Sequence, residues 1–307
     1  MYELPKFLCV KPDIRKALDQ GQAVVALEST IIAHGMPYPQ NLETAQGLES
    51  IIREQGALPA TIAILDGEMK VGLNPDELER LARSSDVLKV SRRDLSYTLA
   101  LGLPGACTVA ATMMIAHWAG IKVFATGGIG GVHRGASESM DISADLKELG
   151  STPVAVVSAG AKAILDIGLT LEYLETEGVP VLGYQCEEFP AFYSRQSGFK
   201  VGRKIDSVED LAKILQTHQR LQLKSGILIA NPIPEKYEMA YQEMQEAIQQ
   251  AILEADQKEI KGKELTPFLL QRIKEITQGQ SLEANIELVS NNAHLAARIA
   301  RALSELD

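Results

Sequence analysis

Seven short apolar runs, rich in Val, Ile and Ala, recur along this chain and are nearly continuous in hydrophobicity instead of alternating with polar residues. Strands buried on both faces have this pattern, and they occur in parallel sheets that helices cover on both sides. Longer segments with apolar residues at helical spacing separate the runs, so the order predicts an α/β fold with a largely parallel central sheet. The runs are residues 23–29, 61–67, 87–91, 121–128, 153–160, 179–185 and 226–232.

The segments between the runs begin at residues that commonly cap helices. From Glu235 to Asp307 the chain has no convincing strand and reads as helices. Because no Gly/Ser-rich or Pro-rich linker precedes this helical part, we expect it to pack on the sheet within a single domain of residues 1–307. Earlier in the chain we expect helices over 41–56, 74–85, 108–120 and 206–221, with N-cap candidates Asn41, Asn74, Thr108 and Asp206.

The charge balance bears on the kind of ligand. Among 307 residues, 40 are Asp or Glu and 30 are Lys or Arg, which gives a formal net charge of -10, and aromatic residues make up only 5%. Nucleic-acid polymers are usually bound through a basic surplus and stacking aromatic side chains, so such a polymer is not expected as a partner. One phosphate group on a small molecule remains acceptable, because a few local cations can hold it.

The cysteines and the N-terminus indicate the compartment. Cys9, Cys107 and Cys186 are widely spaced and form no CxxC motif, so neither a disulfide framework nor a cysteine zinc site is expected. The first 20 residues carry charges and lack the apolar core of a secretory signal. No stretch approaches the roughly 20 apolar residues of a membrane helix. We therefore expect a soluble, cytoplasmic protein.

In open α/β sheets, ligands bind at the carboxyl ends of the strands, so polar residues that follow apolar runs are the first candidates for a site. Glu28 ends the run at 23–29, where poor solvation would raise its carboxyl pKa and suit it to donate a proton. A strand-end glutamate paired with Lys or Arg is the alternative. His34 and Gly35, just beyond, suit either a site rim or an ordinary turn.

A cluster of cations ends the run at 87–91. Lys89 lies between Leu88 and Val90, and Arg92 and Arg93 follow directly. In an acidic protein such a cluster can seat a phosphate or carboxylate, with Arg suited to bidentate contact. A solvated charged turn is the alternative, and it fits the two arginines better than it fits Lys89.

The segment ATGGIGGVHRG follows another buried strand and is rich in glycine. Backbone N–H groups exposed by such runs can cradle an anion. The spacing matches neither a dinucleotide-binding GxGxxG nor a P-loop, so the nature of the anion stays open.

Two aspartates follow in MDISADL. Asp141 and Asp145 would share one face if a helix starts here, which would supply oxygen ligands for Mg²⁺ or Mn²⁺. A helix N-cap with a favourable acidic first turn is an equally good interpretation.

Lys162 comes just after a buried strand and the Gly160 turn, at what reads as a helix start. Burial and the helix dipole would both depress its pKa and leave a neutral amine that can attack a carbonyl carbon and form a Schiff base. A lysine that extends into solvent is the alternative. The small residues around it favour function, because they leave room for a ligand.

Together these segments resemble the pseudouridine-5′-phosphate glycosidase family, which includes the indigoidine synthase A-like proteins. The resemblance extends from about Leu27 to the C-terminal helix, and nine motifs in the family's order make it specific. They are VALESTIIAHGMPYPQN, DGEMKVGL, KVSRRDL, TVAATMMIAHWAGIKVFATGGIGGVHRG, MDISADL, VVSAGAKAILD, EEFPAFYSRQSG, ANPIP and SLEANIELVSNNA.

The resemblance implies reversible cleavage of the C-glycosidic bond of pseudouridine 5′-phosphate to uracil and ribose 5-phosphate, with one divalent metal ion per subunit, usually Mn²⁺. It also implies a three-layer α/β/α sandwich with a mostly parallel central sheet, and assembly as a homotrimer. The expected partners are therefore small molecules, with no nucleic-acid polymer and no membrane.

The resemblance also assigns roles by position. Lys162 matches the nucleophile that attacks C1′ of the ring-opened sugar and holds it as an imine, and Glu28 matches the acid that protonates the departing uracil carbon. Asp141 matches the metal ligand, with water completing the shell. His133, Thr126 and Asn285 are expected nearby. Substrate contacts match Lys89, the backbone around Val109, and Ser143, Ala144 and Asp145.

A C–C glycosidic bond has no heteroatom leaving group to protonate, so the usual route with two carboxylates is poorly suited to it. A lysine that forms a Schiff base and a proton donor near the uracil carbon suit this reaction better. Two other functions remain open: another Schiff-base lyase, aldolase-like, on a phosphorylated sugar, and a catalytically silent nucleotide-binding member. Cys107 departs from the family, which commonly has a small hydroxyl residue there, and this puts the contacts near Val109 in doubt.

Overall fold

The computed structural model describes residues 6–260 and 265–306, and within them eleven strands form one sheet. The path is β1-β4-β3-β2-β7-β9-β13-β11-β12, with β6 pairing β3 and carrying β5. All pairings are parallel except those of β3 with β4 and with β6. The strands are β1 Leu8–Val10, β2 Val24–Leu27, β3 Leu58–Leu65, β4 Glu68–Val71, β5 Leu88–Val90, β6 Gly105–Cys107, β7 Val123–Ala125, β9 Ala155–Ser158, β11 Val181–Tyr184, β12 Arg203–Ile205 and β13 Ile227–Ala230.

Each of the seven predicted apolar runs contains or overlaps a strand of this sheet, so the largely parallel α/β fold is confirmed. The sequence reading missed the short strands, which are too brief or too polar to form an apolar run; β4, for example, reads Glu-Met-Lys-Val. It also missed a separate antiparallel pair, β8 (Val132–His133) with β10 (Leu165–Asp166). This small pair joins the glycine-rich segment to the chain just after Lys162.

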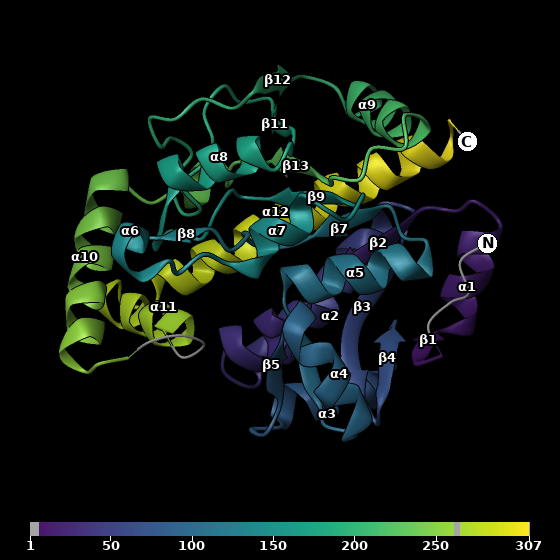
Figure 1. Cartoon of the computed structure of the whole chain (residues 1–307), viewed down its shortest axis with the longest axis horizontal. Helices are drawn as coiled ribbons and strands as arrows, with labels where there is room; N and C mark the ends of the chain where they lie inside the picture. Colours follow the sequence, from purple (N-terminus) through teal and green to yellow (C-terminus); the bar gives the residue numbers. More distant parts are fainter. Residues whose placement is uncertain (1–5, 261–264, 307) are drawn as a thin grey trace.

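Helices cover both faces of the sheet (Figure 1). The long α12 packs on β2, β7 and β9 and has α2 and α9 beside it, while α5 packs on β1 to β4 and contacts α7. None of the helices among the described residues is both long and apolar enough to cross a membrane. The helices are α1 Pro12–Asp19, α2 Gln40–Glu54, α3 Pro75–Arg83, α4 Leu95–Ala100, α5 Val109–Ala119, α6 Ala136–Ser139, α7 Ala144–Leu149, α8 Ile167–Thr176, α9 Val208–Arg220, α10 Tyr241–Gln257, α11 Leu265–Ile276 and α12 Gln280–Ser304.

Two of the four predicted N-caps are confirmed. Asn74 forms a capping box with Glu77, and the Thr108 hydroxyl accepts from the N–H of Ala111. Asn41 is wrong as a cap, because α2 begins before it and its buried amide donates to the carbonyl oxygens of residues 32 and 82. Asp206 is also wrong, since the neighbouring Ser207 hydroxyl accepts the N–H of residue 210.

The C-terminal part is helical, as predicted, and its last helix helps to fix the ends of two strands. Asn292, fully buried on α12, donates from Nδ2 to the backbone oxygen of Thr126 at 2.8 Å. Its Oδ1 accepts from Nδ2 of Asn231, which follows β13, at 3.0 Å. Each bond satisfies a buried polar group that would otherwise lose hydration. The helix thereby holds the carboxyl edge of the sheet, where α11 and α10 pack near its N-terminal end (Figure 1).

Candidate active site

The site lies where β2, β7 and β9 end. These strands are adjacent and parallel, so the residues that follow them meet at one edge of the sheet. Glu28 follows β2, Thr126 follows β7, and Lys162 lies four residues after β9. The structure places Glu28 and Lys162 on the walls of one narrow cleft of about 50 Å³, together with Lys89 from β5.

Glu28 is buried, with 7% of its surface exposed, and its carboxylate is held by two threonine hydroxyls. Thr30 donates to Oε2, and Thr126 donates to Oε1 at 2.5 Å. Burial raises the pKa of Glu28, while the charge of Lys162 and the bond from Thr126 oppose the rise. A carboxyl with a raised pKa keeps its proton closer to neutral pH, which suits a general acid.

Lys162 lies in a loop between β9 and β10, so the predicted helix start at this position is wrong. The next helix, α8, begins at Ile167, and the dipole argument therefore does not apply to this lysine. Backbone bonds hold the loop instead: Lys162 N–H donates to the oxygen of Ile129, and Ile129 N–H donates to that of Gly160, both at 3.0 Å. Half-buried, the lysine lines both the cleft and the larger cavity next to it.

That larger cavity, of about 510 Å³, gathers most of the predicted site. Val109 is not among its lining residues, because its side chain is 1% exposed and packs in the core; Thr108, one residue earlier, lines the cavity. Thr30 and Lys89 line this cavity as well as the cleft, and so join the two. The predicted residues that line it are Lys89, Arg92, Arg93, His133, Asp141, Ser143, Ala144, Asp145 and Lys162.

Asp145 and Asp141 do not share a helix face. Ser143 caps α7, which starts at Ala144, so the N-cap alternative holds and Asp141 lies outside the helix. The buried Asp145 carboxylate accepts the N–H of Ala110 at 2.9 Å and of Gly130 at 2.8 Å. It thus joins the start of α5 to the glycine-rich segment.

Part of the glycine-rich segment is hydrogen-bonded within the protein. The N–H groups of Ile129, Gly130 and Val132 donate to protein oxygens, so these three do not belong to the anion cradle that the sequence predicts. A Cβ on Gly130 would overlap the Ser143 hydroxyl and lie 2.7 Å from Asp145 Oδ2. This position needs glycine because the α7 N-terminus approaches so closely.

Replacing Gly130 by alanine is therefore expected to displace Ser143 and Asp145 at the cavity wall. We expect kcat/KM for pseudouridine 5′-phosphate, the substrate that the resemblance implies, to fall roughly tenfold to hundredfold, which is the range that a misplacement of about 1 Å can cause. Gly47→Ala is the matched control, since a Cβ at this exposed helical glycine would meet nothing within 4 Å. Steady-state kinetics checks the pair, and equal kinetics for both variants would contradict the role given to Gly130.

Arg92 is engaged with a buried carboxylate. Its guanidinium forms a bidentate pair with Glu148, with N–O distances of 2.7 and 2.8 Å, and the Glu148 side chain is only 1% exposed. Arg93 lies 3.8 Å from Asp94 and is more exposed. Arg92 therefore neutralises a buried charge in addition to lining the cavity, which a simple solvated turn would not do.

Asp141 is the residue in the cavity best suited to a metal ion. Its backbone oxygen accepts the N–H of His133 at 3.0 Å, so the two residues lie on neighbouring segments. Burial lowers the pKa of His133, and the charge of Asp141 opposes this. No group of three or more His, Cys, Asp or Glu side chains within the described residues is placed to hold a metal. A hard ion such as Mn²⁺ fits a single carboxylate if water supplies most of the shell.

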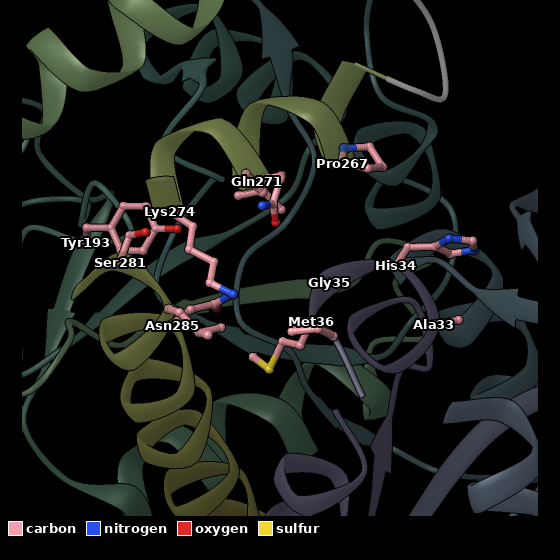
Figure 2. Close-up of a pocket in the computed structure, with 13 residues that line it drawn as sticks. Ala33, His34, Gly35, Met36, Tyr193, Pro267, Gln271, Lys274, Ser281 and Asn285 are labelled. Carbon is pink, nitrogen blue, oxygen red and sulfur yellow. The ribbon is translucent and has the colours of Figure 1, made fainter. Parts of the chain in front are cut away.

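A third cavity, of about 280 Å³, lies on the other side of the cleft between the 33–37 segment and helices α11 and α12 (Figure 2). It shares five lining residues with the cleft: His34, Gly35, Pro267, Leu270 and Asn285. The predicted Asn285 thus lies at the junction. The sequence reading missed α11 and Phe192 as parts of the site, because apolar residues on a helix or in a loop look the same whether they line a cavity or the core.

Comparison with known proteins gives one consistent picture. Residues 13–302 match the family described as indigoidine synthase A like protein. The chain is 60% identical over 306 residues to a pseudouridine-5′-phosphate glycosidase of Alkaliphilus metalliredigens, with 100% of both chains covered. It is 59% identical to that of Caldanaerobacter subterraneus, with 98% of each covered. Among solved structures, the prealnumycin C-glycosynthase AlnA in complex with ribulose 5-phosphate matches with a TM-score of 0.91, 38% identity and 98% coverage of each chain.

Proposed function

The chain belongs to the indigoidine synthase A-like family, and on that premise we propose that it reversibly cleaves the C-glycosidic bond of pseudouridine 5′-phosphate. The products are uracil and ribose 5-phosphate, and Lys162 holds the sugar as an imine between the two half-reactions. The names of the close relatives support the substrate. The sugar phosphate bound by the C-glycosynthase AlnA supports C–C bond chemistry at an open-chain pentose phosphate in this fold.

One observation carries the proposal: a lysine and a buried, hydroxyl-bonded carboxyl face one cleft that opens into a cavity containing cations. The lysine supplies a nitrogen lone pair, the carboxyl supplies a proton, and Lys89 and Arg93 supply positive charge for a phosphate. A binding protein without catalysis would have no use for the first two groups together.

When the C1′–O4′ bond breaks, its electron pair goes to O4′, which takes a proton, while loss of the N1 proton of uracil gives a C5=C1′ double bond. The Lys162 amine then forms a bond to C1′ through Nζ, and the proton that it loses restores the N1–H of uracil. The nitrogen lone pair then forms the C=N bond while the C1′–C5 bond to uracil breaks. The released electron pair goes to C5 of uracil, which takes the proton of Glu28. Water finally hydrolyses the imine, which releases ribose 5-phosphate and restores the amine.

The surrounding residues hold these groups in place. Thr30 and Thr126 fix the Glu28 carboxyl through one hydroxyl each. The Ile129 oxygen fixes the backbone of Lys162. Because the cleft holds only about 50 Å³, the amine and the acid are confined close to any carbon that enters it. Lys89 lines both the cleft and the cation-rich cavity, which fits contact with the sugar phosphate near its reacting end.

A divalent metal, Mn²⁺ by the family resemblance, would be held by Asp141 with water in the remaining positions. When bound, such an ion supplies positive charge that orients and neutralises anionic oxygens of the substrate. Asp141 lies on the wall of the same cavity as Lys89 and Arg93, so an ion held by Asp141 would lie near the end of the sugar that these two cations contact.

Asp141→Asn is expected to weaken Mn²⁺ binding by at least about tenfold, since an amide oxygen carries no charge. Titration of the protein with Mn²⁺, in which the electron paramagnetic resonance signal reports the free ion, measures the Mn²⁺ affinity independently of activity. Glu138→Gln, an exposed carboxylate on the neighbouring α6, is the matched control. Unchanged Mn²⁺ affinity in Asp141→Asn would exclude this residue as the ligand.

The proposed activity is tested by incubating the protein with pseudouridine 5′-phosphate and Mn²⁺ and measuring uracil by chromatography. Uracil release supports the proposal. Absence of release would overturn it, and in that case turnover of another phosphorylated sugar would indicate the aldolase-like alternative, while binding without turnover would indicate a silent member. The proposal includes assembly as a homotrimer, which the mass from light scattering checks.

A further inference from the structure

Three cavities lie in a row across the site, and the reacting groups are in the narrowest of them. The cation-rich cavity of about 510 Å³ and the cleft of about 50 Å³ share Thr30, Lys89 and Lys162. On its other side the cleft adjoins the 280 Å³ cavity through His34, Gly35, Pro267, Leu270 and Asn285. The two large cavities share no lining residue among those described.

This arrangement has a consequence for the covalent intermediate. Once C1′ is bonded to Lys162, the phosphate end of the sugar occupies the side that carries Lys89 and Arg93, where cations can contact it. The released base must still be within reach of Glu28, which lines the cleft but not the cation-rich cavity. The bound sugar therefore lies between the base and the cation-rich cavity.

We propose that the 280 Å³ cavity, which we call the base port, is the route by which the free pyrimidine base enters and leaves while the sugar phosphate remains on Lys162. The inference rests on the proposed function. It assigns separate entrances to the two products, the sugar phosphate through the cation-rich cavity and the base between the 33–37 segment and α11.

The lining of the base port suits a neutral, planar heterocycle. Gln271 and Lys274 point into it from α11, opposite Met36 and Asn285 (Figure 2). Amide groups can bond the alternating carbonyl and N–H edges of such a ring, and apolar side chains can contact its faces. Among the described residues that line the port, Lys274 is the only Lys, Arg, Asp or Glu, so the port lacks the cation cluster that a phosphate needs.

His34 lies where the cleft meets the base port. It lines both the cleft and the base port, and its Nε2 is buried without a hydrogen-bond partner among the described residues. Burial, with Lys89 as a smaller contribution, lowers the pKa of this imidazole and favours its neutral form. A neutral imidazole at this junction leaves the passage without a further charge, which is compatible with an uncharged base.

The experiment narrows the port without touching the cleft. Gln271 lines the base port only, and Gln271→Trp places a large ring in it; Lys274→Trp does the same from one turn further along α11. Glu283→Trp, exposed on α12 and outside the lining, is the matched control. Synthesis from uracil and ribose 5-phosphate is measured for each variant, with thermal unfolding as the check on folding.

We expect either port variant to lower kcat/KM for uracil by about tenfold or more, and to leave KM for ribose 5-phosphate within about twofold of that of the unmodified protein and of Glu283→Trp. Unchanged uracil kinetics in a folded port variant would overturn the proposal, as would a rise in KM for ribose 5-phosphate instead. Borohydride trapping of the imine from ribose 5-phosphate alone does not require uracil. Its failure in the unmodified protein would refute the imine itself, whereas normal trapping with unaltered uracil kinetics would refute only the port.

Discussion

Lys162→Met is expected to abolish uracil release, with a loss of about 10³-fold or more, because the proposed mechanism uses the amine of Lys162 to expel the base. Methionine keeps most of the length of the side chain but has no amine. The loop itself should survive, since the backbone bonds of residues 129, 160 and 162 do not involve the replaced side chain. Uracil release from pseudouridine 5′-phosphate, followed by chromatography, measures the effect.

Lys213→Met is the matched control for this prediction. Lys213 is exposed on α9 and its ammonium group lies 3.3 Å from Asp210, remote in sequence and position from the cleft. An exposed ion pair of this kind contributes little to stability, so this variant should retain full activity. If Lys162→Met also retained activity, the nucleophile would have to be another residue.

Glu28→Gln is expected to have the second largest effect, a loss of about 10²-fold to 10⁴-fold in uracil release, as for a general acid. The amide oxygen can still accept the bond from one of the two threonines, Thr30 or Thr126, and the amide NH2 can donate to the hydroxyl oxygen of the other, but the amide has no acidic proton to give to the uracil carbon. Imine formation from ribose 5-phosphate should persist, because it does not need that proton. A variant that lost imine formation and uracil release equally would indicate a structural role for Glu28.

The raised pKa of Glu28 also predicts a dependence of stability on pH. The folded protein favours the protonated carboxyl, so the stability this group contributes is present at low pH and is lost as the pH rises through the raised pKa. Glutamine cannot ionise. The free energy of unfolding of Glu28→Gln, minus that of the unmodified protein, should therefore increase as the pH rises. Urea unfolding of both proteins at several pH values measures this difference. A difference that is constant with pH would contradict the burial of a titrating carboxyl.

Much of this site could be predicted because parallel strands bring sequence-distant residues to one edge. Glu28 and Lys162 each follow a buried apolar run, and the adjacency of β2, β7 and β9 places them at one cleft. Lys89 was identified by its position inside a strand pattern, and the structure gives it a place on two cavity walls. In each case a polar residue interrupts or ends an apolar pattern, and that signal is local.

The rest depended on contacts between distant segments, which no local pattern reveals. The sequence predicts a helix start at Lys162, yet the backbone of Ile129 holds this residue in a loop. The sequence also offers Asp145 as a metal ligand, yet two backbone N–H groups from other segments bind its carboxylate. The base port is formed by α11, whose amphipathic pattern is the same for a helix that packs on a core and for one that covers a cavity.

The most direct measurement is reduction with borohydride during turnover of pseudouridine 5′-phosphate with Mn²⁺, followed by peptide mass spectrometry. An imine between the open-chain sugar and an amine is reduced to a stable secondary amine, so the adduct marks the nucleophile. We predict one ribose 5-phosphate adduct, on Lys162. An adduct on another lysine, or uracil release with no adduct under conditions that trap a control Schiff base, would contradict the mechanism.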